Sequence, residues 1–398
     1  MLSFETALST VLQNALPAGC ESVALGDSLH RILAEDIFSD IDMPPFDKSA
    51  MDGFACRRED IIVAGKQLNM TQLRCIETIP AGSKPEKTIG AGECARIMTG
   101  AMVPPGADCV IMVEDTDEPD PGLIRMIRGA VSNNICYRGE DIRMGDKVLA
   151  RGTQIGAAHI AVLASVGGVN PLVSKMPRVA IISTGDELVE PDEKPGPASI
   201  RNSNAAQLIA QVKQVPAIPQ YMGIARDNPQ SLREMINQAL ESNDLLLLSG
   251  GVSMGEHDYV PQVMAECGIS ILCKSVAIQP GRPTVFGRKG DQFVFGLPGN
   301  PVSTFVLFEV MVKPFLKKMM GSETTPITLT LPLGVDFTRR NATRRSLIPA
   351  GIHCGEAIPL NYHGSAHIHA YTEASAIITI DPGVTVKNKG EFVDVRLL

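Results

Sequence analysis

Acidic side chains in three separate loops are the residues of this chain best suited to chemistry. Asp186 and Glu187 occur in STGDEL, Asp227 comes shortly after IPQYMGIA, and Glu256 and Asp258 occur in SGGVSMGEHD. Carboxylate oxygens are hard ligands, and Mg²⁺ prefers one or two of them together with water and phosphate oxygens. If the loops converge, the sequence predicts a magnesium site that acts on a phosphoanhydride. For each acid alone, capping of a following helix is the alternative.

The segments around these loops predict a parallel α/β unit. From Pro177 onward strand-like and helix-like patterns alternate, which is typical of parallel sheets; the segments are 178–188, 202–214, 232–242, the four leucines at 245–248, and 292–321. The leucine run lacks period-two alternation, so both of its faces should be covered. Ligands of open α/β sheets bind beyond the carboxyl ends of the strands. The loops STGDE, SGGVSMGEHD and LPGNP should therefore converge on one crevice.

Glycines and one arginine in this region suit an anionic ligand. Gly250, Gly251 and Gly255 have no Cβ, so they let the backbone approach an anion closely. Arg282 follows a Pro-Gly pair in AIQPGRPTVFG, and its guanidinium can bind an oxyanion as a fork. An ordinary surface ion pair is the alternative for this arginine. A second dense turn, PPFDKSAMDGFA, carries two acids within six residues, and we predict that it is more than a linker.

The rest of the chain predicts further domains. Apolar residues at helical spacing over 3–16, with Ser3 as a cap, predict an amphipathic helix. Short β-like pieces with turn signals extend from about 24 to 150, and a helix starting near Ile155 should end at Gly167 and Gly168. From about 323 the chain is again β-like. The predicted fold class is a multidomain α/β plus β protein whose main domain is an open, mostly parallel sheet.

Histidines near the C-terminus suggest a second, weaker metal hypothesis. His367 and His369 should point to the same face of a strand, with His353 and His363 nearby in the sequence. No cysteine or acid completes a familiar ligand spacing. A solvated strand face explains the histidine pair equally well.

Composition narrows the class of protein. A chain of 398 residues predicts two to four domains. The net charge of −8 and the absence of a Lys/Arg stripe argue against binding of nucleic acid. Nine cysteines without a CxxC pair argue against a disulfide framework or a structural zinc site and favour reduced thiols. The N-terminus lacks the features of a signal peptide and no apolar run reaches about 18 residues, so we expect a cytoplasmic protein without a membrane partner.

Taken together, these motifs resemble the molybdopterin molybdenumtransferase family, the bacterial molybdenum-insertion enzymes that are similar to the gephyrin E domain. The resemblance covers nearly the whole chain, and its motifs occur in family order: PPFDKSAMDGFA, RIMTGAMVPPGADCVIMVED, RGEDI, STGDEL, SGGVSMGEHD, PGRP and LPGNPVS. The resemblance implies an enzyme that inserts molybdate into adenylylated molybdopterin in a Mg²⁺-dependent step and releases AMP and molybdenum cofactor.

The resemblance also implies an architecture and partners. It implies an elongated homodimer with an N-terminal helical linker domain (1–23 with 40–54 and 140–174), a β-rich inserted domain (24–139), an α/β molybdopterin-binding domain (175–322) and a small β-barrel-like C-terminal domain (323–398). The molybdopterin adenylyltransferase is an implied protein partner. Sequence does not distinguish molybdate from tungstate, because the two oxyanions have nearly the same size and charge.

Roles carry over from the family by position. The implied catalytic residues are Asp258, Asp227, Glu187, Asp52, Asp141 and Thr99, and Asp227 and Asp258 are the implied metal ligands. The implied substrate-binding and cofactor-binding residues are Thr184, Gly185, Asp186, Ser249, Gly250, Gly251, Ser253, Gln279, Arg282, Pro298, Gly299, Asn300, Pro301 and Ser365. Among these, Ser253, Arg282 and Ser365 resemble molybdate-side contacts, and Arg340 or Arg344 would supply a further cation.

The chain departs from the family pattern at three positions. Ser275 and Gln279 stand where the family often has lysine, and Cys136 stands where some relatives have arginine. A neutral side chain attracts a dianion less strongly than a lysine does, although Lys274 is adjacent to Ser275. One alternative is therefore a non-catalytic paralogue that binds the pterin or acts as a scaffold. Another is the adenylylating sister enzyme, which shares the α/β domain but typically lacks the long N-terminal half and the C-terminal β domain.

Overall fold

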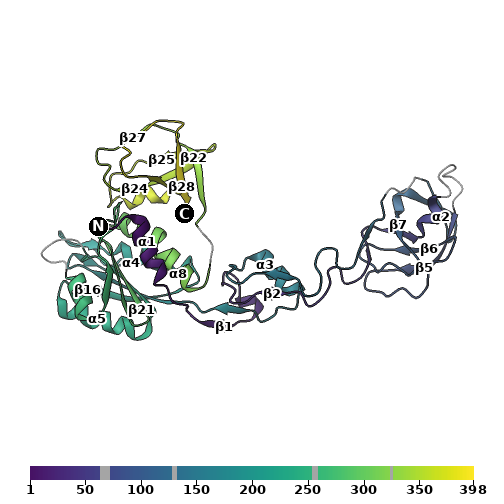
Figure 1. The fold of residues 1–398 in the computed structure, drawn as a ribbon, viewed down its shortest axis with the longest axis horizontal. Coiled ribbons are helices and arrows are strands. Elements are labelled where there is room, and N and C mark those ends of the chain that lie inside the picture. The colour runs from purple at the N-terminus through teal and green to yellow at the C-terminus, as the bar shows by residue number, and fades with distance from the viewer. Residues whose placement is uncertain (63–71, 128–131, 253–258, 323–325) are drawn as a thin grey trace. The chain divides into compact units, whose positions relative to one another are not determined.

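The computed structural model describes residues 1–62, 72–127, 132–252, 259–322 and 326–398 (Figure 1). The chain forms two compact units. The first unit comprises Met1–Glu35, Arg151–Ile160 and Asn170–Leu398, and the second comprises Asp36–Ala150 and Ala161–Val169. Within the described part of the chain, no helix combines the length and the apolar character that a membrane crossing requires.

A mixed six-stranded sheet is the centre of the first unit. Its strand order is β16-β13-β17-β21-β20-β18. The first four strands are parallel: β16 (Ile218–Ala225), β13 (Arg178–Thr184), β17 (Leu245–Ser249) and β21 (Gln292–Leu297). The next strand, β20 (Val285–Lys289), is antiparallel to β21, and the last, β18 (Ser270–Cys273), is antiparallel to β20. The predicted parallel strands are confirmed, and the antiparallel pair makes the sheet mixed.

The leucine strand β17 is buried on both faces. Leu245 and Leu247 contribute to one hydrophobic core, whereas Leu246 and Leu248 contribute to the core on the opposite face. Side chains alternate between faces of a strand, so an unbroken apolar run needs a cover on each side. The covering of both faces that the sequence predicts is confirmed.

Helices supply the two covers. Helices α4 (Ser203–Lys213), α7 (Pro301–Leu307), α8 (Lys313–Met319) and α1 (Phe4–Gln13) contribute to the first core, and α5 (Pro229–Ser242) and α6 (Val260–Glu266) contribute to the second. Figure 1 shows α1 beside α8. The predicted cap Ser3 accepts a hydrogen bond from Thr6 N at 3.1 Å. A π-helical segment, Phe308–Val312, joins α7 to α8.

A second sheet, from the C-terminal part of the chain, completes the first unit. It contains β24 (Arg345–His353), β25 (Glu356–Pro359), β26 (Ala376–Ile380), β28 (Phe392–Leu397) and β22 (Thr328–Pro332). The short strand β19 (Ile278–Gln279) comes from the α/β part and pairs in parallel with the start of β24. This pairing holds Gln279 beside Ser346, so a loop of the α/β part becomes an edge of the C-terminal sheet. Short pairs in this unit are β1 (Cys20–Ser22) with β12 (Leu172–Ser174), β14 (Leu188–Val189) with β15 (Ile200–Arg201), and β23 (Phe337–Thr338) with β27 (Val386–Lys387).

The second unit is β-rich, as the sequence predicts. Its six-stranded sheet has the order β7-β4-β6-β5-β9-β8 and is antiparallel except between β5 and β6. The strands are β4 (Gly53–Cys56), β5 (Gln72–Ile79), β6 (Glu93–Ile97), β7 (Cys109–Met112), β8 (Thr116–Asp120) and β9 (Leu123–Met126). The helix α2 (Arg58–Ile62) follows β4, and the short strands β2 (Ile37–Phe38), β3 (Lys48–Ser49), β10 (Ile135–Cys136) and β11 (Lys147–Leu149) form separate pairs. The predicted helix at Ile155 is α3 (Ala157–Ser165), which crosses the boundary between the units and ends before Gly167.

The prediction that His367 and His369 lie on a strand is wrong. The structure has a 3₁₀ helix, Ile368–Thr372, with His367 as its N-cap. Tyr371 is buried and its ring lies 4.9 Å from that of Phe305. This packing favours a helical turn over the strand that the alternation His-Ile-His predicts. Across the described ranges no three His, Cys, Asp or Glu side chains are placed to hold a metal ion.

Candidate functional site

One polar cavity lies at the carboxyl ends of β13, β17 and β21. Its volume is about 650 Å³. All three loops that were predicted to converge contribute to its walls. The residues of the predicted site that line it are Thr184, Gly185, Glu187, Asp227, Ser249, Gly250, Gly251, Pro298, Gly299, Asn300 and Pro301. The convergence predicted from strand order is therefore present, whereas the role of each residue remains a prediction.

Strand register explains why the three loops begin at the same level. Ser249 at the end of β17 is paired with Ser183 on one side and with Leu297 on the other. Residues that follow paired positions in parallel strands emerge together at one edge of the sheet. The three loops therefore start level with one another and enclose the cavity.

Asn204, in the first turn of α4, connects two of these loops. Its Nδ2 donates to Ser249 Oγ and to the Gly299 carbonyl oxygen, both at 2.8 Å. Its Oδ1 is buried, as is Thr184 Oγ1, and neither atom has a hydrogen-bond partner within the described ranges. Buried polar atoms of native proteins are almost always hydrogen-bonded, so these two atoms are exceptions among the residues that line the cavity.

A second hydrogen-bond chain stabilises the cavity wall. Ser183 Oγ donates to Asn202 Oδ1 at 2.9 Å, Asn202 Nδ2 donates to the Tyr221 hydroxyl at 3.0 Å, and that hydroxyl donates to Glu190 Oε1 at 2.7 Å. Burial, and then the carboxylate of Glu190, raise the pKa of Tyr221, so the hydroxyl remains a donor at neutral pH. Asn202 also caps α4 by accepting from Ala205 N.

The sequence did not identify Asn202, Asn204 or Arg201 as site residues, although all three line the cavity. The available signal was the segment NSN at the start of a predicted helix, because asparagine is a common cap but an unfavourable residue inside a helix. A second asparagine two positions after the cap therefore suggests a role other than helix formation.

Asp186 and Asp227 lie in neighbouring loops, and the carboxylate of each faces the backbone N of the other. Asp227 N donates to Asp186 Oδ1 at 3.2 Å, and Asp186 N lies 3.4 Å from Asp227 Oδ2. Both side chains are exposed. Helix α5 is capped by Asn228, whose Oδ1 accepts from Gln230 N at 2.8 Å. The capping alternative is thus met by Asn228, and Asp227 is one of the residues that line the cavity.

Gly250 is required by the close approach of two loops. Its φ is +106°, and an added Cβ would lie 2.5 Å from the Thr184 carbonyl oxygen. A non-glycine residue would be strained here and would displace the loop that carries Thr184. The sequence predicts that Gly250 leaves room for an anion. In the structure, the loop that carries Thr184 occupies the space that a Cβ of Gly250 would need.

A second cavity of about 580 Å³ lies where the α/β part meets the C-terminal sheet. Gln279, Arg340, Ser346 and Tyr362 are among the residues that line it. Arg339 also lines it, but its Nε donates to the Val384 carbonyl oxygen at 2.6 Å and its Nη1 to that of Arg344 at 2.9 Å. The exposed Arg340 has no ion-pair partner among the residues that the structure describes. Arg340 therefore supplies the available positive charge of this cavity.

Two segments of the chain contribute residues to both linings. Residues 279 and 280 line the second cavity and Pro283 the first; likewise Gly364 lines the second and Ala366 the first. Arg282 and Ser365, both predicted site residues, lie within these segments, although neither is part of either lining. The Ser365 carbonyl oxygen accepts from Val302 N at 3.0 Å, which fixes this segment to the start of α7.

The remaining predicted residues lie elsewhere. Asp52 and Thr99 contact each other in the second unit, where Asp52 Oδ1 accepts from Thr99 N at 2.6 Å and from Thr99 Oγ1 at 2.8 Å. These hydrogen bonds lower the pKa of Asp52. Asp141 is an exposed residue of the same unit. Ser253 and Asp258 lie outside the described residues.

Comparisons with known proteins agree with this arrangement. Three family models match in order: the MoeA N-terminal region (domains I and II) over residues 2–167, a probable molybdopterin binding domain over 180–318, and the MoeA C-terminal region (domain IV) over 330–398. The molybdopterin molybdenumtransferase of Staphylococcus epidermidis is 36% identical over 403 residues, which cover 100% of this chain and 95% of that protein. The enzyme of the same name from Bacillus subtilis is 36% identical over 387 residues, which cover 95% and 90%.

Solved structures match over the same length. Two crystal structures of the molybdopterin biosynthesis MoeA protein from Pyrococcus horikoshii superpose on this chain with TM-scores of 0.83 and 0.86. Their sequence identities are 33% and 28%. The first match covers 100% of this chain and 99% of that one, and the second covers both chains fully.

Proposed function

Because the chain belongs to the MoeA family of molybdopterin molybdenumtransferases, we propose that it inserts molybdate into adenylylated molybdopterin and releases AMP. Its place in molybdenum cofactor biosynthesis follows from full-length relatives at 36% identity. The observation that carries the finer proposal is a pair of cavities in the first unit whose linings share the segments 279–283 and 364–366. One cavity is polar and lies at the strand ends, and the other contains Arg340.

The strand-end cavity is the proposed site of the pterin substrate. A pterin carries both donors and acceptors on its ring, and the cavity offers both kinds of partner: Thr184 Oγ1 can donate or accept, and Asn204 Oδ1 can accept. Arg201, also in the lining, is positioned to contact phosphate oxygens, with its Nε held by the Glu193 carbonyl oxygen at 3.0 Å. The substrate would thus be bound at its ring and at its phosphates by different walls.

Mg²⁺ is the cofactor that we propose for cleavage of the adenylate. The donor chemistry fits, since Asp227 and Asp186 present exposed carboxylates at the ends of neighbouring strands, and Mg²⁺ is commonly held by one or two carboxylates plus phosphate oxygens. We propose Asp227 and Asp258 as the protein ligands. A bound Mg²⁺ would neutralise charge on the phosphoanhydride.

The second cavity is the proposed molybdate site. Molybdate is a tetrahedral dianion, so it requires a fixed cation and hydrogen-bond donors. Arg340 provides the cation, and the amide of Gln279 can donate in place of the lysine that is frequent in the family. Ser253, Arg282 and Ser365 remain proposed contacts of molybdate. Because the segments 279–283 and 364–366 each contribute to both linings, we propose that molybdate enters beside the bound pterin.

In the proposed reaction, water attacks the adenylate phosphorus, the anhydride P–O bond breaks and the molybdopterin phosphate leaves, so that the product AMP carries the oxygen of the water. Glu187, an exposed carboxylate in the cavity lining, is proposed to accept the proton of the water. Positioning and charge neutralisation supply most of the acceleration of such reactions. In the proposed last step two S–Mo bonds form between the dithiolene sulfurs and molybdate, and one oxygen of molybdate leaves as water with the two thiol protons.

We further propose the architecture and partners that the family resemblance implies. These are a homodimer in the cytoplasm, the four-domain division with a β-barrel-like C-terminal domain, and receipt of substrate from the molybdopterin adenylyltransferase. The order of the three family matches supports the domain division. In the dimer, Asp52, Thr99 and Asp141 of one subunit are proposed to complete the cleft of the other.

The direct test is AMP release from adenylylated molybdopterin by the full chain with Mg²⁺, measured with and without molybdate. We expect release that molybdate stimulates and that a chelator abolishes. The Asp258→Ala variant should bind the substrate without releasing AMP. Tight pterin binding without release by the unmodified chain would support the scaffold alternative and refute the transferase.

Arg340→Ala should weaken molybdate binding. Loss of a charge-assisted hydrogen bond costs about 1.5–3 kcal/mol, so the molybdate concentration for half-maximal AMP release should rise by about tenfold or more. Arg344→Ala is the matched control, because the Arg344 side chain does not line the cavity and its Nη1 lies 3.4 Å from the Ile278 carbonyl oxygen. Equal effects of the two substitutions would contradict the assignment of Arg340.

A further inference from the structure

Four cysteines form a row across the sheet of the second unit. Cys109 on β7 pairs with Cys56 on β4, Cys56 pairs with Cys94 on β6, and Cys94 pairs with Cys75 on β5. All four side chains contribute to, or pack against, one hydrophobic core, so they lie on one face of the sheet. The proposed reaction uses none of them. The row brings together thiols that are far apart in the sequence.

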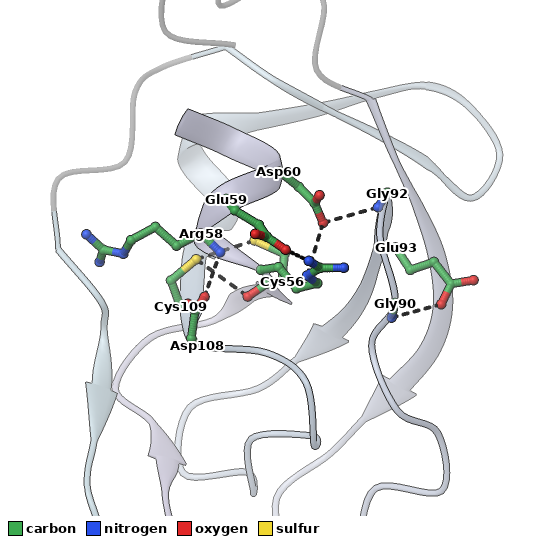
Figure 2. Close-up of polar contacts among 10 residues, drawn as sticks. Cys56, Arg58, Glu59, Asp60, Gly90, Gly92, Glu93, Asp108 and Cys109 are labelled. Carbon is green, nitrogen blue, oxygen red and sulfur yellow. Dashed lines mark hydrogen bonds and ion pairs between the residues drawn. The ribbon is translucent and has the colours of Figure 1, made fainter. Parts of the chain in front are cut away.

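Cys56 and Cys109 are the pair that is closest to bonding. Their sulfur atoms are 3.6 Å apart and both side chains are fully buried (Figure 2). Residues directly opposite in an antiparallel pair have Cα atoms about 4.5–5.5 Å apart, which lies within the range of about 4.4–6.8 Å found for disulfides. The backbone is therefore already placed for a cross-link, and side-chain rotation has to bring the sulfur atoms together.

The surroundings make Cys109 the better nucleophile of the pair. The hydrogen bond from the Cys56 thiol lowers the pKa of Cys109; burial and the carboxylate of Asp108 oppose this lowering, and the Arg58 guanidinium adds to it. The same hydrogen bond and burial raise the pKa of Cys56. Arg58 also begins α2, and its backbone N donates to Asp108 Oδ1 at 2.6 Å (Figure 2). A thiolate is the attacking species in disulfide exchange.

Access to Cys109 follows from its place in the sheet. Strand β7 is an edge strand of four residues. On its outer side, Val110 N donates to the Asn133 carbonyl oxygen and Asn134 Nδ2 donates to the Val110 carbonyl oxygen, both at 2.9 Å. Short edge elements open locally at lower free energy than central strands. Local opening at this edge is the route by which we propose that a small disulfide reaches Cys109.

We propose that Cys56 and Cys109 are a modification site that forms a reversible disulfide by exchange with a low-molecular-weight disulfide. The Cys109 thiolate attacks one sulfur of the small disulfide, whose S–S bond breaks, and one small thiol leaves. Cys56 then gives its proton to solvent and attacks the Cys109 sulfur of the mixed disulfide, and the second small thiol leaves. Two protein thiols are oxidised and one small disulfide is reduced to two thiols.

The cross-link should stabilise the second unit. Closing the chain between the two residues removes conformational freedom from the unfolded state. It also fixes the edge strand β7 to β4. Oxidised protein should therefore show a higher unfolding temperature for this unit than reduced protein, and a reducing agent should reverse the shift.

The test treats the full native chain with oxidised glutathione, blocks the remaining thiols with an alkylating reagent and maps the linkages by mass spectrometry. We expect one peptide pair joined through Cys56 and Cys109. Cysteines outside the pair should carry the alkylating reagent or, at the exposed Cys20 and Cys354, glutathione. Dithiothreitol should return the linked pair to free thiols. Failure to form the link, stable glutathione adducts alone, or a link between Cys75 and Cys94 in its place would overturn the proposal.

Matched variants sharpen the result. Cys56→Ser and Cys109→Ser should each abolish the link and the thermal shift. Cys94→Ser removes a buried thiol of the same row and should leave both unchanged. Loss of the link in Cys94→Ser as well would show that the row acts as a relay and would refute direct exchange at the pair. The linkage map of the unmodified chain decides the proposal even where a variant does not fold.

Discussion

Replacing Asp227 by asparagine is expected to slow AMP release by about 10²–10³-fold, the range found when one electrostatic contact to a transition state is removed. The amide has nearly the same shape as the carboxylate and can still accept a hydrogen bond from Asp186 N, so the loop should keep its conformation. The amide lacks the negative charge that holds a hard cation against the phosphates. Pterin binding should persist, because its proposed contacts lie on Thr184 and Asn204.

Single-turnover assays over a range of Mg²⁺ concentrations measure this effect. The Asp227→Asn variant should need more Mg²⁺ for half-maximal release as well as releasing AMP more slowly. Asp291→Asn is the matched control, since Asp291 is an exposed carboxylate just before β21, at the opposite end of that strand from the cavity. A rate for Asp227→Asn within about threefold of the unmodified chain would remove Asp227 from the proposed metal site, because one lost contact should cost far more.

Local sequence signals were sufficient to predict several of the helices and strands of the first unit. The leucine run predicted a strand with both faces buried, and Ser3 predicted the start of α1, because each signal acts within a few residues of its effect. Strand order then predicted that three loops would line one cavity. Such predictions depend on periodicity and capping, which the chain displays directly.

Contacts between distant segments could not be predicted in the same way. Asn204 reaches Ser249 and Gly299, and β19 pairs with β24 to place Gln279 in the second cavity. Neither contact has a local pattern, because side-chain direction and sheet-to-sheet pairing follow from tertiary packing. The histidine segment was mispredicted for the related reason that burial of Tyr371 decides its conformation.

Replacing Asn204 by alanine should impair the site while leaving the sheet intact. The substitution removes both hydrogen bonds to the strand-end loops and leaves the Gly299 carbonyl oxygen without this donor. A buried group that loses its partner costs about 1–3 kcal/mol, which denaturant unfolding of the full chain should detect. The loops would no longer be held at a fixed separation, so AMP release should fall by about 10²-fold, as misplacement by an ångström can do.

Asn204→Asp separates loss of the hydrogen bonds from a change of charge. An aspartate side chain keeps the size of asparagine but cannot donate, so it faces the Gly299 carbonyl oxygen with a second acceptor and adds negative charge to a cavity proposed to bind phosphates. We expect weaker substrate binding than in Asn204→Ala. Lys213→Ala, at the exposed far end of α4, controls for helix stability and should leave activity unchanged. If Asn204→Ala retained normal activity, Asn204 would be a structural link only, and the unpartnered Oδ1 would have no part in recognising the substrate.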